Sequence, residues 1–112
     1  MDRIKTVCER KVMSMAKYLL LWELNQDKMP DDPKARGEGW VMMLDMIKQD
    51  LETGVHSDWG TFVGEMRGYT VTENDPVELM KLIQRFAPFV VFEVHQVVSV
   101  DDVMKVAKSL SG

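Results

Sequence analysis

Short segments rich in apolar, β-branched and aromatic residues predict four strands. The short, almost wholly apolar run at 17–24 is typical of a strand that is buried on both faces. Residues 57–64 and 69–73 flank a glycine-bounded turn at 64–68, which predicts a hairpin. Residues 89–98 are rich in valine and phenylalanine and predict the fourth strand.

A long amphipathic helix is expected between the first two strands. Asp32 followed by Pro33 is a good helix start, and Gly54 is a good stop. Gly37 and Gly39 weaken the first turn, so we expect regular helix from about residue 37. The apolar stripe, at spacings of four, three and four, consists of Trp40, Leu44, Ile47 and Leu51.

Two further capping sequences predict two shorter helices. Asp75-Pro76 begins one, which Pro88 ends before the fourth strand. Residues 99–102 begin a short C-terminal helix. The resulting order, β-α-β-β-α-β-α, predicts an α+β protein with the ferredoxin-like βαββαβ pattern, an antiparallel sheet with its two longer helices on one face.

The second face of this sheet is too apolar to meet water. Leu19 and Leu21 alternate with Leu20 and Trp22 in the first strand, and the fourth strand is similarly apolar on both sides. Burial of apolar surface contributes roughly 25 cal/mol per Å², so exposure of several such side chains would cost several kcal/mol. We therefore expect a homodimer whose sheets pack face to face.

Composition limits the protein class. A chain of 112 residues and 12.9 kDa suits one domain with a single core, and a net charge of −4 argues against a general nucleic-acid binder. No apolar run approaches the roughly 20 residues of a membrane span, and no secretory signal is present, so we expect a cytoplasmic protein. The single cysteine, Cys8, excludes an internal disulfide.

The N-terminal head differs from the rest in charge. Residues 1–16 carry four basic and two acidic side chains, a net charge of +2, whereas the other residues carry ten basic and sixteen acidic side chains, a net charge of −6. We interpret residues 1–14 as an N-terminal extension, helical or disordered, and residues 15–112 as a single ferredoxin-like domain. The head is an appendage, the result of a start codon placed too early, or an arm that packs on a partner subunit.

Three segments carry a resemblance to a known family type. KYLLLWEL at 17–24, DWGTFVGEMRGY at 58–69 and FVVFEVHQVVSVDD at 89–102 resemble small uncharacterised prokaryotic proteins of the dimeric α+β barrel type. The resemblance implies a dimer with a cleft between each sheet and its two helices. It implies no catalytic residue, because that superfamily includes monooxygenases, haem enzymes, isomerase-like enzymes and ligand sensors.

Glu93 and His95 are the first candidates for chemistry. At positions i and i+2 of a strand they share a face, so the carboxylate could orient or charge the imidazole for proton transfer. The alternative is a hydrogen-bonded pair at the dimer seam. His56 precedes the second strand and is expected to be an exposed loop residue. No metal-ligand spacing occurs and no cofactor is predicted, although His95 alone could serve as a haem ligand.

Aromatic residues could form a pocket for a flat ligand. Trp22, Trp59 and Tyr69 supply large apolar surfaces, and Trp59 and Tyr69 lie on the two arms of one hairpin, where they could face each other. Arg67 could hold an anionic group at the mouth of a cleft. Ordinary packing in the core or at an interface is the alternative for the aromatic residues, and for Trp40 it is the expectation.

These observations indicate a protein of uncharacterised function. The leading hypothesis is a homodimeric module that binds a small apolar or aromatic ligand or another protein. The alternative is a small monooxygenase- or isomerase-like enzyme that uses the cleft between sheet and helices. The residues alone leave open whether a reaction is catalysed.

Overall fold

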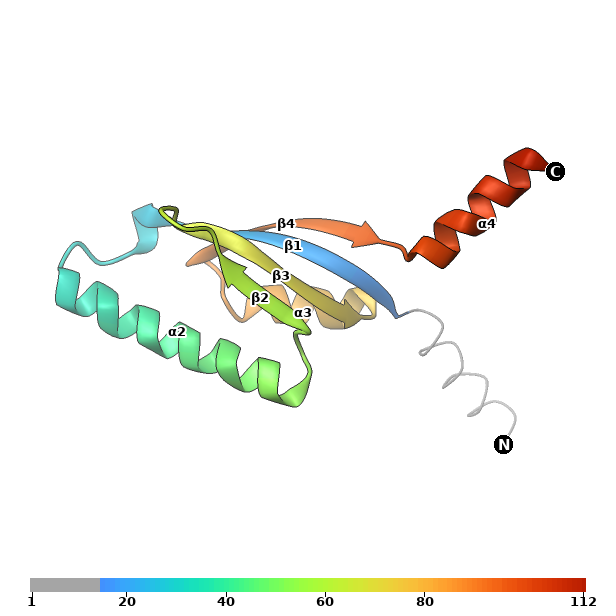
Figure 1. The fold of residues 1–112 in the computed structure, drawn as a ribbon. Helices are drawn as coiled ribbons and strands as arrows, with labels where there is room; N and C mark the ends of the chain where they lie inside the picture. The colour runs from blue at the N-terminus through green and yellow to red at the C-terminus, as the bar shows by residue number, and fades with distance from the viewer. Residues whose placement is uncertain (1–14) are drawn as a thin grey trace, which may run out of the picture.

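The protein has an α+β fold, as the sequence predicts (Figure 1). The computed structural model describes residues 15–112, so the predicted N-terminal extension at 1–14 lies outside the described residues. The elements are strand β1 (Ala16–Leu24), the 3-10 helix η1 (Gln26–Lys28), helix α2 (Pro33–Thr53), strands β2 (Asp58–Thr61) and β3 (Arg67–Asn74), helix α3 (Pro76–Gln84), strand β4 (Val90–Val97) and helix α4 (Val100–Ser111).

The four strands form one antiparallel sheet in the order β2-β3-β1-β4. The two strands that α2 connects, β1 and β2, are therefore separated by β3. The two strands that α3 connects, β3 and β4, are separated by β1. Because crossovers between parallel strands are right-handed, α2 and α3 both lie against the same face of the sheet (Figure 1).

The core lies between this face and the helices. The even-numbered side chains of β1 are buried there, and Leu20 is only 1% exposed. Leu79 and Leu82 of α3 and the following Phe86 complete the buried cluster. The odd-numbered residues Leu19 and Leu21 point to the other side, because successive strand residues alternate between faces.

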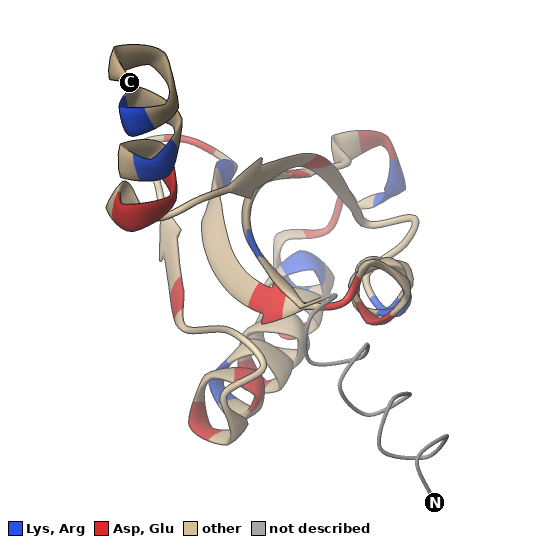
Figure 2. Cartoon of the chain, turned by 90° about the vertical axis from the view of Figure 1, so that its right-hand side faces the viewer, with Lys and Arg blue, Asp and Glu red and all other residues tan. Residues whose placement is uncertain are grey.

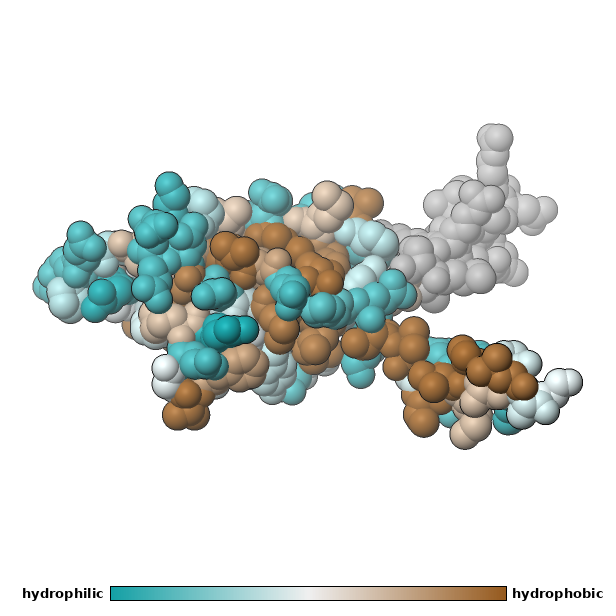
Figure 3. Space-filling model, turned by 90° about the horizontal axis from the view of Figure 1, so that it is seen from above, coloured by the Kyte–Doolittle hydropathy of each residue, from teal (hydrophilic) through white to brown (hydrophobic). Residues whose placement is uncertain are grey.

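The other side of the sheet, here called the open face, carries no helix of residues 15–112 (Figure 1). Residues directly opposite in the ladder share a face, so the register assigns to the open face Leu19, Leu21, Tyr69, Val71, Val91, Glu93, His95 and Val97. Figure 3 looks onto this face and shows apolar side chains gathered over the middle of the sheet.

Helix α4 projects away from the rest of the described chain (Figure 1). Ser99 and Asp102 cap the N-terminus of α4 reciprocally, because Ser99 Oγ accepts from Asp102 N–H and the Asp102 carboxylate accepts from Ser99 N–H. Acidic residues lie near its N-terminus and basic residues near its C-terminus (Figure 2), which complements the helix dipole. Its apolar side is exposed and consists of Val100, Val103, Met104, Val106 and Leu110.

The capping predictions for α2 and α3 are confirmed. Asp32 accepts from Ala35 N–H at 3.1 Å, and Asp75 accepts from Val77 N–H at 2.9 Å. The expectation that regular helix begins near residue 37 was wrong, since α2 begins at Pro33. The aspartate cap and the proline after it offset the weak propensity of the two nearby glycines.

The predicted hairpin is present, but strand β2 is shorter than the predicted strand at 57–64 and strand β3 is longer than the predicted strand at 69–73. Strand β2 ends at Thr61, and β3 already begins at Arg67. The loop closes on itself, because Phe62 N–H donates to Arg67 O at 2.9 Å and Glu65 N–H donates to Phe62 O at 3.1 Å. Gly64, in the turn, has φ +83°, a left-handed conformation that glycine adopts without strain.

Gly68 permits the close approach of β3, β2 and Trp22. A Cβ atom there would collide with the Gly60 carbonyl oxygen and would lie 2.6 Å from Trp22 Cζ2. We expect Gly68→Ala to lower the free energy of unfolding by about 1–3 kcal/mol, measured by urea denaturation. Gly37→Ala is the matched control, since nothing lies within 4 Å of its added methyl group on α2. It should raise stability by about 0.5–1 kcal/mol, and equal stabilities for the two variants would contradict the packing described.

Candidate functional site

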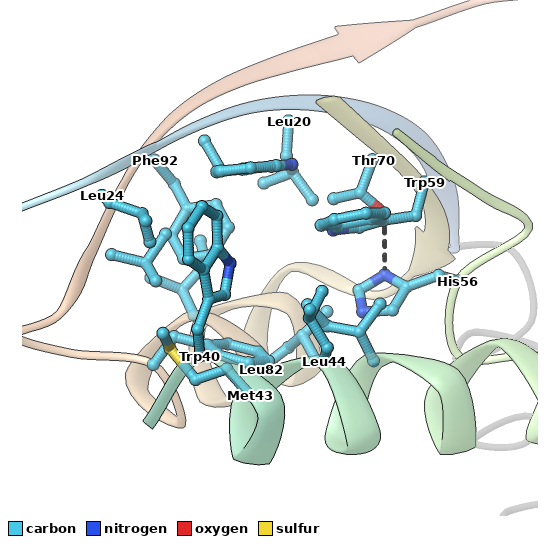
Figure 4. A pocket seen from close by; sticks show the side chains of 15 residues that line it. Leu20, Leu24, Trp40, Met43, Leu44, His56, Trp59, Thr70, Leu82 and Phe92 are labelled. Atoms are coloured by element: carbon cyan, nitrogen blue, oxygen red, sulfur yellow. Dashed lines mark hydrogen bonds between the residues drawn. The ribbon is translucent and has the colours of Figure 1, made fainter. Parts of the chain in front are cut away.

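A cavity lies between the sheet and the two helices (Figure 4). Its volume is about 40 Å³. Its walls come from both layers: Leu20, Trp22, Leu24, Trp40, Met43, Leu44, Ile47, His56, Trp59, Thr70, Leu82, Ile83, Phe86, Val90 and Phe92. Apart from the indole N–H groups of the tryptophans, only His56 and Thr70 supply polar side-chain groups to this wall.

All three tryptophans of the chain line this cavity. Trp22 and Trp59 stack with ring centroids 5.2 Å apart and planes 8° from parallel. Trp22 Nε1–H donates to the carbonyl oxygen of Tyr69 at 3.2 Å, which fixes the ring in the sheet. Trp40 extends from α2 toward the sheet (Figure 4) and is half-buried at the cavity wall, where the sequence predicts a core residue.

His56 is buried, and the expectation of an exposed loop histidine was wrong. Its exposure is 4%. Gly54 ends α2 in a left-handed conformation, and the amides of Val55 and His56 both donate back to Asp50 O. Ser57 N–H then donates to Val71 O at 2.9 Å. These bonds direct the chain under the edge of the sheet, so that the imidazole faces the cavity (Figure 4).

A polar cluster lies at this end of the cavity. Asp50 is the one buried residue of α2, and its two carboxylate oxygens accept from Arg85 Nη1 at 3.0 and 3.2 Å. His56 Nε2 lies 3.5 Å from Asp50 Oδ2, and His56 Nδ1 lies 3.0 Å from Thr70 Oγ1. The Thr70 hydroxyl donates to Asp58 O at 2.8 Å. The cluster thus connects α2, the residue after α3, and the sheet.

The threonine determines the tautomer of His56. A hydroxyl has one proton, and Thr70 gives it to the Asp58 carbonyl oxygen, which can only accept. Thr70 Oγ1 must therefore accept from His56, so that Nδ1 carries the proton of the neutral imidazole. In that tautomer Nε2 is a hydrogen-bond acceptor.

The neutral form of His56 is favoured by its surroundings. Burial lowers the pKa of His56 below its ordinary value of 6.5, because the charged imidazolium loses its hydration. The negative charge of the Asp50 carboxylate raises the pKa and the Arg85 guanidinium lowers it, but desolvation dominates. A neutral imidazole in an apolar cavity can accept a hydrogen bond or a proton from a bound molecule.

The predicted pair Glu93 and His95 does come together, with His95 Nε2 3.1 Å from Glu93 Oε2. It lies on the open face and not in the cavity, and the two side chains are 66% and 51% exposed. The pair is therefore on the opposite side of the sheet from Trp22 and Trp59.

The remaining predicted ligand residues, Tyr69 and Arg67, are also separated from the cavity. Trp59 pairs with Thr70 and Tyr69 pairs with Gly60, so Trp59 and Tyr69 point to opposite faces of the hairpin. Tyr69 OH donates to Asp58 Oδ2 at 2.9 Å, and this bond to a carboxylate raises the pKa of the phenol. Arg67 is exposed opposite Glu23 at one end of the open face.

One signal for the missed residues was present in the sequence. Asp50 is three residues after Ile47 and seven after Met43, which places a carboxylate in the register of the apolar stripe. A charge at such a position needs a buried partner. The signal did not identify Arg85 or His56 as that partner, because neither is near Asp50 in a helical register.

Two kinds of functional feature are absent from the described residues. Within residues 15–112, no group of three or more His, Cys, Asp or Glu side chains could hold a metal ion. In the same part of the chain, no helix has both the length and the apolar character needed to cross a membrane.

The chain belongs to a family described as a domain of unknown function (DUF3303), whose model matches residues 16–111. No curated protein and no solved structure matches it. The description of the family assigns no function, which agrees with the expectation of a protein of uncharacterised function.

Burial of a neutral histidine makes stability depend on pH. Because the pKa is lowered in the folded state, the unfolded chain binds the proton first, and stability is lost as pH falls below about 6.5. We expect the free energy of unfolding of wild type to decrease between pH 7.5 and 5.5 more steeply than that of His56→Gln, by up to about 1.4 kcal/mol per pH unit.

His95→Gln is the matched control, since it removes the other histidine from an exposed position. It should retain the slope of wild type in urea denaturation. A slope in His56→Gln equal to that of wild type would show that His56 is not held in the neutral form by folding.

Proposed function

We propose that the protein is a small-ligand-binding module whose apolar or aromatic ligand occupies the cavity between sheet and helices. The observation that carries this proposal is the cavity wall, in which three tryptophans accompany aliphatic side chains and only two polar side chains, His56 and Thr70. Binding sites for small molecules typically combine an apolar wall with a few convergent polar groups.

The cavity must widen to admit an aromatic ring, because its volume of about 40 Å³ suits only a few water molecules. Helix α2 is the wall suited to such a movement. Asp50, near its C-terminal end, is its one buried residue, whereas Trp40, Met43 and Leu44 are only half-buried. An outward shift of the N-terminal half of α2 would enlarge the cavity while the contacts of Asp50 stay in place.

We also infer that a second copy of the chain covers the open face. Leu19, Leu21 and Val71 lie side by side in its middle, and the apolar side of α4 is uncovered as well. A helix of about 12 residues is marginal in water unless its apolar side packs on something. The split βαβ connectivity supports a ferredoxin-like, dimeric α+β barrel architecture, in which two such sheets pack face to face.

The charges of the open face are compatible with burial against a second copy. Lys17 is directly opposite Glu73 in the ladder, Glu23 is directly opposite Arg67, and Glu93 contacts His95. Each of these charges thus has a neighbour of opposite sign or a titratable partner on its own sheet, and Asp58, which pairs with Val71 on the same face, accepts from Tyr69 OH. A second copy would therefore pack on an apolar centre, and the charges around it are mostly paired within each sheet.

The enzyme alternative has no observation in its favour. Glu93 and His95, which that hypothesis placed at the reaction centre, lie on the face opposite the cavity. A monooxygenase- or isomerase-like activity in the cavity would have to use His56, and the geometry supports binding there without identifying a reacting group.

Binding in the cavity can be tested with fluorobenzene, followed by ¹⁹F NMR. We expect wild type to bind it and Leu44→Trp to weaken binding by about tenfold or more, because the larger ring fills the cavity. Met42→Trp is the matched control, since Met42 is 70% exposed on the same helix. Failure of wild type to bind, or equal binding by Leu44→Trp, would contradict the proposed site.

The dimer can be tested by placing a charge in the middle of the open face. We expect wild type to sediment at twice the chain mass of 12.9 kDa and Leu19→Lys to sediment as a monomer, because a buried ammonium group there stands opposite Val71 and His95 and has no carboxylate directly across the ladder. Met80→Lys alters an exposed position on α3 and should remain dimeric. A monomeric wild type at micromolar concentration would refute the proposed interface.

A further inference from the structure

The polar end of the cavity offers one acceptor to a ligand. Of the two polar side chains in the wall, Thr70 uses its proton on Asp58 O and accepts the Nδ1–H of His56. The two oxygens of Asp50 both accept from Arg85. Nε2 of His56, a residue of the cavity wall, then remains as an acceptor without a protein donor among the described residues.

The distance from Nε2 to Asp50 leaves this acceptor unused by the protein. The separation of 3.5 Å from Asp50 Oδ2 exceeds the ordinary 2.7–3.2 Å of an N–H···O bond. Both atoms are acceptors in the tautomer that Thr70 imposes, so no proton lies between them. Among the described residues, no side chain or amide donates a hydrogen bond to Nε2 within the geometry of an ordinary bond.

We propose that His56 Nε2 accepts a hydrogen bond from the hydroxyl of the ligand, and that the ligand is a flat aromatic alcohol, a phenol, whose ring lies against Trp59. This inference rests on the proposed function, because it assigns the ligand class of the same cavity. Trp59, stacked on Trp22, supplies the flat wall beside His56 (Figure 4).

The same groups disfavour other small aromatic molecules. An aromatic carboxylate would need His56 Nε2 as a donor, and Nε2 lies 3.5 Å from Asp50 Oδ2. The ligand's negative charge would therefore lie beside that of Asp50. A ring without a donor, such as fluorobenzene, would fit the apolar wall but leave Nε2 unpaired and buried. A neutral hydroxyl on a ring meets both requirements.

The test compares phenol with fluorobenzene, which differ chiefly in the hydroxyl. We expect wild type to bind phenol about three- to tenfold more tightly than fluorobenzene, the range that a single hydrogen bond typically provides. Competition against fluorobenzene, followed by its ¹⁹F signal, measures both affinities in one sample. Benzoate should compete more weakly than phenol.

Two variants locate the preference at His56. His56→Phe should bind fluorobenzene but lose the preference for phenol. Thr70→Val retains the histidine but removes the acceptor of Nδ1–H, so the proton should move to Nε2, where it can bond Asp50. This variant should also lose the preference, and the ¹⁵N chemical shifts of the imidazole should report the change of tautomer. Thr61→Val, an exposed position on β2, is the matched control and should behave as wild type.

The outcomes separate this inference from the proposed function. If phenol and fluorobenzene bind wild type equally well, or if both His56→Phe and Thr70→Val keep the preference, the assignment of the ligand class is wrong while the binding site stands. If neither compound binds wild type, the proposed function itself fails and the inference fails with it.

Discussion

Asp50 places a carboxylate in the register of an apolar helix stripe, and the position of α2 over the sheet depends on the partners of that carboxylate. Burying an unpaired charge costs several kcal/mol, so α2 can approach the sheet only where Arg85 reaches both oxygens of Asp50. His56 then lies against the same carboxylate, and Thr70 joins the imidazole to the sheet. The C-terminal end of α2 is thereby tied down through polar contacts.

The cavity is a consequence of this arrangement. A helix that met the sheet through apolar side chains alone would bury its stripe, whereas Trp40, Leu44 and Ile47 are only half-buried and Leu51 is 38% exposed. The space that these side chains do not fill lies beside the polar cluster. An apolar wall and a single oriented acceptor therefore occur together because the same residue, Asp50, determines the position of the helix and the surroundings of His56.

Local signals in the sequence predicted the elements well, and long-range partners could not be predicted in the same way. The caps at Asp32 and Asp75 and the strand at 17–24 depend on neighbouring residues, and all three were predicted correctly. His56 has nothing apolar in a regular pattern around it, and its burial follows from a turn at Gly54 and a contact with Asp50. Glu93 and His95 were correctly placed on one face, but the pattern of β4 is apolar on both sides and did not reveal which face the helices cover.

The cavity and the open face are two sides of one strand. Leu20 and Trp22 of β1 line the cavity, and the intervening Leu19 and Leu21 lie on the open face. A second sheet packed against the open face would restrain β1 and with it the wall of the cavity that the sheet forms. Helix α2, on the other side of the cavity, would be less restrained, because Asp50 is its one buried residue. In the proposed dimer a ligand would therefore enter by displacing the N-terminal half of α2, and the sheet with its stacked tryptophans would serve as the rigid surface on which the ring is held.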